Sequence, residues 1–389
     1  MALDKALPIF LCGFLSIPLA FMLNLFHAMR NPILVLVAGV LSLSLVIAIP
    51  FIFKKTTKPK HDSFYYVWSI FTFSSVIDMV LALENDGIIN SVMGFYLQEG
   101  EPYLQTAYGT FICYWDAIAH MMMYVVILSA DSFNWRYRTG VLYWVGSIGH
   151  SMLVFLSGNF VGKFGVKWGV FINIPYLVIP ILAGYKMLNK KLESKSIVHR
   201  NFNVFSKPAD VGFLMYFILA AGVGCFRAFA VLGCLSDVTQ NYLKYYEPYL
   251  TDPTQYPKMQ MLVYLFYFVP FYVYAIKSLV NGDNSSGISD WAVIHAGAAA
   301  QAQIPHIGSS LHHMTDPALR VPKNMNAQIL FWGLNITLLI IPQLFAYRCA
   351  PSNIDDKRKI QRPVKDNEEN MTRSYNTRSK TRNTTKKDI

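Results

Sequence analysis

Three ionisable side chains lie inside stretches of sequence that are otherwise apolar. Asp78 and Asp116 fall within consecutive apolar stretches, and His120 follows Asp116 by four residues, which places the two on one face of a helix. A charged group at the depth of a bilayer costs at least about 2.5–3.5 kcal/mol on insertion scales. Such groups therefore indicate either a binding or reaction site or a buried structural network.

The chemistry expected of these residues is that of an acid-lined cavity. Asp78, Asp116 and His120 are the candidates for proton transfer, because carboxyl and imidazole groups serve as general acids and bases. Aromatic residues surround them, and Glu84 follows at the end of the same stretch as Asp78. The predicted ligand-binding residues are Asp78, Glu84, Tyr114, Trp115, Asp116 and His120. The alternative is a structural network in which Asp116 and His120 satisfy each other.

Composition places this chain among membrane proteins. Hydrophobic residues make up 53% of its 389 residues, while only 15% are charged. Soluble domains carry about 25% charged residues, so a soluble enzyme and a disordered chain are both excluded. In a membrane protein, a net charge of +11 reflects basic cytosolic loops and does not indicate nucleic-acid binding. The five cysteines form no disulfide or metal-binding spacing, and the sequence predicts no cofactor and no metal site.

Apolar stretches long enough to cross a bilayer predict an all-α, polytopic membrane protein with about ten transmembrane helices. The expected helices are residues 7–26, 32–53, 63–84, 108–130, 139–158, 168–188, 209–231, 260–281, 289–312 and 326–348. The ninth is the least apolar, and its many small residues favour close packing against other helices. Lysines and arginines follow the second and sixth stretches, which predicts cytosolic termini and a lumenal loop after the third.

The last four stretches repeat the four before them. Glu101-Pro102-Tyr103-Leu104 recurs as Glu247-Pro248-Tyr249-Leu250, and Asn173, Pro180 and Tyr185 recur as Asn335, Pro342 and Tyr347. A repeat of four helices leaves both copies in the same orientation. The predicted organisation is an N-terminal two-helix segment (1–60), two four-helix repeats (61–186 and 210–347) and a disordered basic cytosolic tail (351–389).

The second copy lacks the acids of the first. Arg227 takes the place of Asp78, and Tyr264 lies near the place of Asp116. Arg227 is expected to neutralise a carboxylate, either of the first copy or of Glu247, whereas Glu247 itself is expected in a solvated lumenal loop. Four further polar residues lie within the ninth stretch, as interhelical hydrogen-bonding groups or as the lining of a second cavity: His295, Gln301, Gln303 and His306.

These segments resemble the transmembrane 6 superfamily. The resemblance rests on FTFSSVIDMVLALENDG, EGEPYLQTAYGTFICYWDAIAH, LYWVGSIGHSMLVFLSGNFVGK and HAGAAAQAQIPHIGSSLHH, and it covers about residues 8–349. It implies ten helices with two copies of the EXPERA domain, which is shared with the emopamil-binding-protein sterol isomerases and the sigma-2 receptor. The resemblance to those isomerases implies a histidine and a glutamate four residues apart. This sequence departs from that pattern, because it offers Asp78 and Glu84, which are six residues apart.

The resemblance implies a role in lipid handling: support of triglyceride loading and lipoprotein secretion, and control of lipid-droplet content. Membrane lipids or sterols and lipoprotein-assembly proteins are the implied partners. Three functions are expected to compete: a regulator that binds a sterol or lipid, a sterol isomerase, and a lipid transporter or scramblase. Lys386 and Lys387, the fourth and third residues from the end, resemble a dilysine retrieval signal. They favour the endoplasmic reticulum and the compartment between it and the Golgi over the lysosomal alternative.

Overall fold

The computed structural model describes residues 3–56, 64–133, 135–190, 207–234, 236–282 and 286–350. Predictions about residues 351–389, including the retrieval signal Lys386 and Lys387, and about the basic loop 191–206 lie outside the described residues. All regular elements in the described part are helical, in agreement with the all-α prediction.

The N-terminal segment forms two membrane-crossing stretches. Helices α1 (Leu3–Phe14) and α2 (Ser16–Asn24) follow each other with an interruption at Leu15, where the sequence predicted one continuous helix. The short turn η1 (His27–Arg30) leads into α3 (Pro32–Thr56), which begins with proline at its first position, where a missing N–H costs nothing. Both α1 and α3 pack against α4, so this pair covers one side of the helices that follow.

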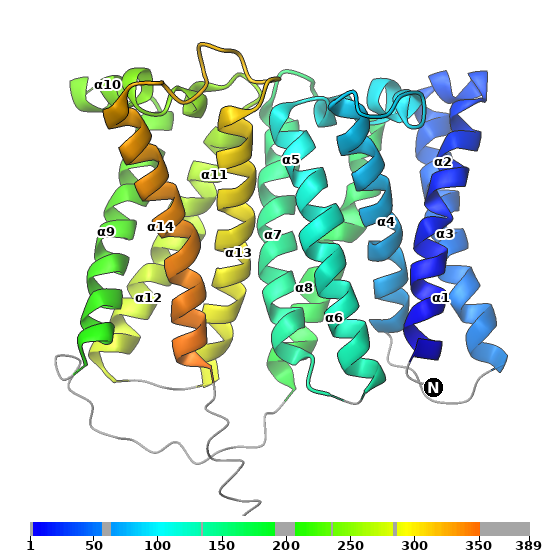
Figure 1. Ribbon diagram of the computed structural model, residues 1–389, viewed down its shortest axis with the longest axis horizontal. Helices are drawn as coiled ribbons and strands as arrows, with labels where there is room; N and C mark the ends of the chain where they lie inside the picture. Colours follow the sequence, from blue (N-terminus) through cyan, green and yellow to red (C-terminus); the bar gives the residue numbers. More distant parts are fainter. Residues whose placement is uncertain are drawn as a thin grey trace, which may run out of the picture. The chain divides into compact units, whose positions relative to one another are not determined.

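The next four membrane-crossing stretches form the first set of helices. They are α4 (Phe64–Asn85), the chain α5–η4–α6 (Ala107–Trp115, Asp116–His120 and Met121–Ser132), α7 (Arg138–Val161), and η5–α8 (Trp168–Asn173 and Ile174–Asn189). The turns η2 (Tyr96–Gly100) and η3 (Pro102–Leu104) lie between α4 and α5. Figure 1 shows these turns at the end of the bundle where α4 ends.

The second set has a similar order of long helices. It comprises α9 (Pro208–Val231), the surface helix α10 (Asp237–Tyr245), η7 (Pro248–Thr251), the chain α11–η8–α12 (Tyr256–Val263, Tyr264–Phe268 and Val269–Val280), α13 (Ser286–Leu311) and α14 (Met325–Cys349). The turns η4 and η8 are both single π-helical turns, and they occupy the positions that the sequence repeat pairs with each other. Glu101 and Glu247 have nearly the same backbone angles, φ −133° with ψ 68° and φ −137° with ψ 66°. These matches fit the two-copy interpretation, whose domain boundaries stay a prediction.

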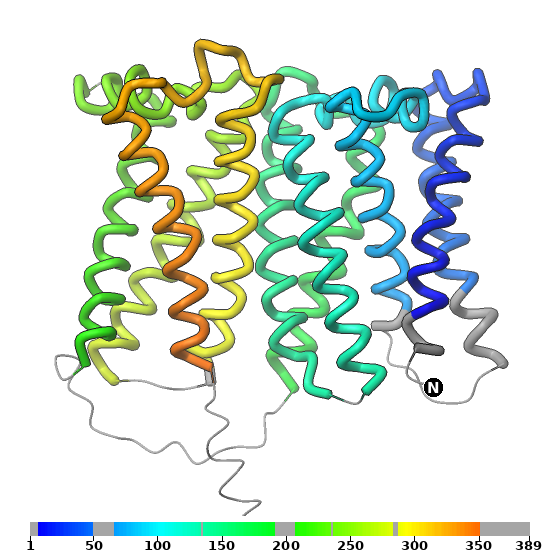
Figure 2. Tube along the Cα trace, viewed as in Figure 1, coloured from blue at the N-terminus to red at the C-terminus, as the bar shows by residue number. Residues whose placement is uncertain are grey.

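Nine of the long helices in the described residues are long and apolar enough to cross a membrane. Helix α13 is the tenth long helix, and it is not among those nine. Its 26 residues include many alanines and polar side chains, most of which face other helices instead of lipid. In Figures 1 and 2 it stands beside α7 and α14, the two helices against which it packs most extensively.

Small residues allow the two sets of helices to approach closely. A Cβ atom at Gly146 of α7 would overlap the carbonyl oxygen of Ile294, and one at Gly297 of α13 would overlap that of Tyr143. The contact between α7 and α13 therefore brings backbone against backbone, which is how helices pack in membranes. This confirms the close packing that the small residues of the ninth stretch predicted.

Candidate functional site

Asp116 and His120 lie at the two ends of the π-helical turn η4, in the middle of a membrane-crossing stretch. Single π turns inside α-helices are rare and occur mostly at functional sites. Both side chains are buried, with 8% of Asp116 and 1% of His120 exposed. The wider turn directs both of them toward α4 and α7.

The Asp116 carboxylate and the His120 ring form a complete hydrogen-bond network. One carboxylate oxygen of Asp116 lies 2.6 Å from Nδ1 of His120, and the other accepts a 2.5 Å hydrogen bond from the hydroxyl of Ser75. Nε2 of His120 lies 2.7 Å from the hydroxyl of Ser147, which also accepts a 3.0 Å hydrogen bond from the indole of Trp115. Each oxygen of Asp116 and each nitrogen of His120 thus has a protein partner. The network joins α4, η4 and α7.

Asp78 of α4 has a different environment. Its carboxyl group interacts with those of Asp116 and Glu101, and the thiol of Cys113 lies 3.8 Å from Oδ1. Among the described residues, no lysine or arginine forms an ion pair with Asp78. Asp78 is therefore the least satisfied acid of the group.

A partly open cavity of about 150 Å³ joins these residues to the N-terminal helices. Asp78, Glu101, Asp116 and His120 form its polar part. Its apolar part comes from α2 and α3, with α4, α7 and α8 on the other side. The aromatic residues in its walls are Phe73, Phe95, Tyr96, Phe155 and Tyr176. The combination is an apolar chamber with several acids at one place and few cationic groups to neutralise them.

Three predicted pocket residues do not line this cavity. Glu84 accepts hydrogen bonds from the backbone N–H groups of Ser91 (3.1 Å) and Met93 (2.6 Å), so it holds the loop that follows α4. Tyr114 donates a 2.7 Å hydrogen bond to Asp86. Trp115 is engaged with Ser147, as described above. Proximity in sequence does not tell which face of a helix points inward, and the assignment of these three residues to a ligand site stays a prediction.

Glu101 was not among the predicted site residues, yet it lines the cavity. Only 3% of it is exposed, and it accepts hydrogen bonds from Tyr103 (2.6 Å), Tyr96 (2.8 Å) and Asn173. Burial raises the pKa of Glu101 to about 7, although these three donors oppose the shift. The recurring Glu-Pro-Tyr-Leu motif contained the signal that would have identified it.

Glu247 holds the equivalent position in the second set and has a cationic partner. Arg227 forms an ion pair with it, Tyr242 donates a 2.5 Å hydrogen bond to it, and Asn335 donates one of 3.2 Å. Burial favours the neutral acid, but Arg227 and the hydrogen-bond donors prevail and lower the pKa of Glu247 to about 2. With 2% exposed, Glu247 is buried, so the expected solvated loop position is wrong. Arg227 neutralises Glu247 of its own set.

The remaining predicted polar residues of the second set each have a different contact partner. Gln303 donates a hydrogen bond to Tyr264, and the hydroxyl of Ser147 lies 3.5 Å from Oε1 of Gln301. His306 lies 3.3 Å from Glu247. His295 stacks on the ring of Phe271 at 4.0 Å between ring centroids. None of these side chains lines the cavity described above.

Comparison with known proteins divides the chain in two. Residues 15–198 match the family model "Transmembrane 6 superfamily member 2-like, transmembrane domain", and residues 234–349 match the EXPERA model of the expanded EBP superfamily. Transmembrane 6 superfamily member 2 of Mus musculus is 39% identical over 345 residues, covering 87% of this chain and 90% of the relative. The proteins of Rattus norvegicus and Homo sapiens are 38% and 37% identical, covering 86% of this chain and 89% and 90% of their own lengths. No solved structure matches. The chain is a multi-pass membrane protein that belongs to the transmembrane 6 superfamily.

Proposed function

We propose that this protein is a regulator of lipid metabolism in the endoplasmic reticulum membrane and that it binds an amphiphilic lipid or sterol in the cavity beside Asp78. In this proposal the polar head of the ligand lies among the acids, and its apolar part lies against α2 and α3. Ligand binding would control the protein's part in triglyceride and lipoprotein secretion, through contacts with lipoprotein-assembly proteins.

The observation that carries this proposal is the difference between the two sets of helices. In the second set, Arg227 neutralises the buried Glu247. In the first set, the position of Arg227 is taken by Asp78, so that Asp78 and Glu101 lie together without a cation among the described residues. A ligand with an amino or hydroxyl head would supply the missing hydrogen-bond donor. An amine would also supply the missing charge, in surroundings where charges are poorly screened.

The size of the cavity limits what part of the ligand it holds. A volume of about 150 Å³ is comparable to engineered cavities that hold a benzene molecule, so it suits a head group or one ring. Whole drug-sized ligands occupy pockets of about 300–1,000 Å³. The remainder of a lipid or sterol would therefore extend past α2 and α3, whose outer faces carry exposed apolar side chains such as Phe21 and Leu41.

Equilibrium binding to the purified full-length protein tests this proposal. The two probes are a fluorescent long-chain primary amine and an uncharged fluorescent sterol. Asp78→Asn keeps the size of the side chain and removes its charge, so we expect at least tenfold weaker binding of the amine. For the sterol, which loses at most one hydrogen bond worth about 0.5–1.5 kcal/mol, we expect a loss of about 2- to 13-fold.

Glu99→Gln is the matched control, because Glu99 belongs to the nearby turn η2 but does not line the cavity. It should leave the affinity for both probes unchanged. Equal affinity of wild type and Asp78→Asn for both probes, in folded protein, would contradict the proposal. Lipid mass spectrometry on the wild-type protein would identify the natural ligand.

Sterol isomerisation is the second candidate, and one arrangement favours it. Two carboxyl groups, Asp78 and Asp116, lie beside each other, and Asp116 contacts the His120 ring, so that an acid and a base are available within one apolar cavity. Moving a double bond requires one group to protonate the alkene and another to remove a proton. Turnover of a labelled sterol by the wild type that is lost in Asp78→Asn would support catalysis. Binding of the sterol without turnover would support the ligand-binding regulator instead.

A further inference from the structure

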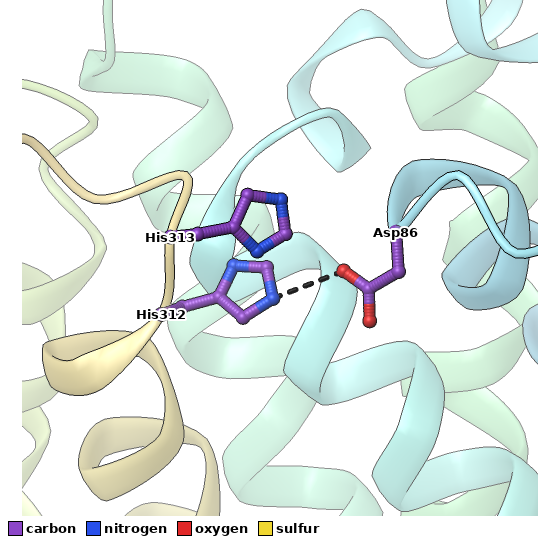
Figure 3. A group of neighbouring side chains, drawn as sticks. All are labelled: Asp86, His312 and His313. Carbon is purple, nitrogen blue, oxygen red and sulfur yellow. Dashed lines mark hydrogen bonds and ion pairs between the residues drawn. The ribbon is translucent and has the colours of Figure 1, made fainter.

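Two histidines and an aspartate meet where the two sets of helices adjoin. Asp86 follows α4 directly, whereas His312 and His313 follow α13, 226 residues later in the chain. Each of the three residues has a ligand atom within 4.8 Å of the ligand atoms of the other two. Figure 3 shows both imidazole rings on the side of the Asp86 carboxylate. This group is separate from the cavity, whose walls include none of the three.

The Asp86 carboxylate is held in a fixed orientation. Its Oδ2 accepts a 2.7 Å hydrogen bond from the hydroxyl of Tyr114, and its Oδ1 lies 3.0 Å from Nε2 of His312. Oδ1 therefore faces the histidines, while Oδ2 is held by Tyr114 of α5. Metal-binding carboxylates are commonly oriented by such an additional hydrogen bond.

The turn that carries the histidines is also held in place. Arg320 donates hydrogen bonds to the carbonyl oxygens of His313 (2.6 Å) and Thr315 (2.8 Å). The guanidinium is thereby engaged with the backbone. The His313 side chain is exposed, and its ring centroid lies 4.2 Å from that of His312. Among the described residues it makes no side-chain hydrogen bond, so it can turn toward a ligand without losing one.

We propose that Asp86, His312 and His313 bind a zinc ion. Two imidazole nitrogens and a carboxylate oxygen are a ligand set of catalytic zinc sites, in which water occupies the fourth position. Zinc bonds of about 2.0–2.1 Å in a tetrahedron place the ligand atoms about 3.4 Å apart. Ligand atoms that already lie within 4.8 Å reach this spacing through a small rotation of the exposed His313 ring.

Zinc at this position would replace the direct contact between His312 and Asp86. Nε2 of His312 would bind the metal, and the ring would carry its proton on Nδ1. The long 3.4 Å contact from the N–H of Met314 to Nδ1 would then be lost, which is a small cost. The ion would connect the loop after α4 with the loop after α13. The sequence offered no metal motif because the ligands are separated by more than 200 residues.

Zinc binding to the full-length protein tests this inference. After removal of metals with a chelator, ZnCl2 is titrated by calorimetry, and CoCl2 is titrated by visible absorption, which reports a tetrahedral site. We expect one ion per chain and a higher midpoint temperature of unfolding in the presence of zinc. His313→Ala and Asp86→Asn should each weaken zinc binding at least tenfold. His27→Ala, at an exposed histidine of η1 outside the group, should have no effect.

The decisive variant is His313→Ala, because this exposed side chain makes no hydrogen bond to the described protein and its loss should leave the fold intact. Wild-type zinc affinity in folded His313→Ala would overturn the proposal and leave a structural hydrogen bond between Asp86 and His312. Absence of zinc binding by the wild type would overturn it as well. MgCl2 at the same concentration should not produce the thermal shift, because magnesium prefers oxygen ligands.

Discussion

Glu101 and Glu247 share a sequence motif and a backbone conformation, but the same substitution should have opposite effects at the two positions. Glu247 is buried against Arg227, whereas Glu101 is buried against neutral donors only. Replacing Glu247 by glutamine leaves the Arg227 guanidinium buried without a counter-charge, which costs about 3–5 kcal/mol. Replacing Glu101 by glutamine removes a carboxylate that burial destabilises above neutral pH.

The two glutamates should change the stability of the protein in opposite directions as pH rises. The pKa of Glu101 is raised by burial from 4.5 to about 7, so between these values the folded state holds a proton that the unfolded state has released. The unfolding free energy therefore falls as pH rises through this window, by about 3 kcal/mol in total. The pKa of Glu247 is lowered to about 2, so its contribution is complete above pH 4.5 and is lost as pH falls toward 2.

Thermal unfolding of the purified protein in detergent between pH 5 and 8 provides the assay. We expect Glu101→Gln to match or exceed the midpoint temperature of the wild type at pH 8 and to reduce the pH dependence across this range. Glu247→Gln should lower the midpoint at every pH. Equal destabilisation by both substitutions at pH 8, or an unchanged pH dependence in Glu101→Gln, would refute the electrostatic difference between the two sets of helices.

Three further predictions concern helix packing, membrane topology and localisation in the cell. Gly146→Ala should destabilise the protein by about 1–3 kcal/mol, because the added Cβ would overlap the Ile294 carbonyl group. Gly149→Ala on the same helix is the control, because its Cβ meets nothing within 4 Å. Equal unfolding midpoints of the two variants would contradict the close approach of α7 and α13. Asn-X-Ser/Thr glycosylation sequons occur at Asn284, Asn335, Asn370 and Asn383. Endoglycosidase treatment should leave the mobility of the protein unchanged, because Asn335 is buried and the other three are expected in the cytosol; a mobility shift would contradict the orientation. Substituting serine for both Lys386 and Lys387 should move the protein toward the Golgi in cell imaging, and an unchanged reticular pattern would show that retrieval depends on another signal.

The helices and the close approach of Asp78 and Asp116 followed from sequence patterns. Apolar length located the membrane-crossing stretches, since a spanning helix must match the thickness of a bilayer. The two acids have similar depths on consecutive antiparallel helices, and the structure places their carboxyl groups beside each other. Depth along a helix can be counted from the sequence, whereas the assignment of the two acids to a ligand site stays a prediction.

Orientation around a helix could not be counted in the same way. Tyr114 and Trp115 adjoin Asp116 in sequence but point to Asp86 and Ser147. The π-helical turn at Asp116 changes the direction of the following side chains around the helix axis, and no residue pattern predicted this turn. Burial of Glu247 was also missed, because a glutamate beside a proline is typical of a solvated loop, although Arg227 of α9 was already a candidate partner for it.

Photolabelling in native membranes tests the central claim, ligand binding in the cavity beside Asp78, most directly. The probe is a long-chain primary amine with a photoreactive group in its chain, and the labelled peptides are identified by mass spectrometry. We predict labelling of α2, α3 and α4 at cavity-lining residues such as Leu23, Val35 and Ile77. We also predict that this labelling is lost in Asp78→Asn and retained in Glu99→Gln. Undiminished labelling of these peptides in Asp78→Asn, or labelling confined to the outer faces of α9, α12 and α14, would contradict it.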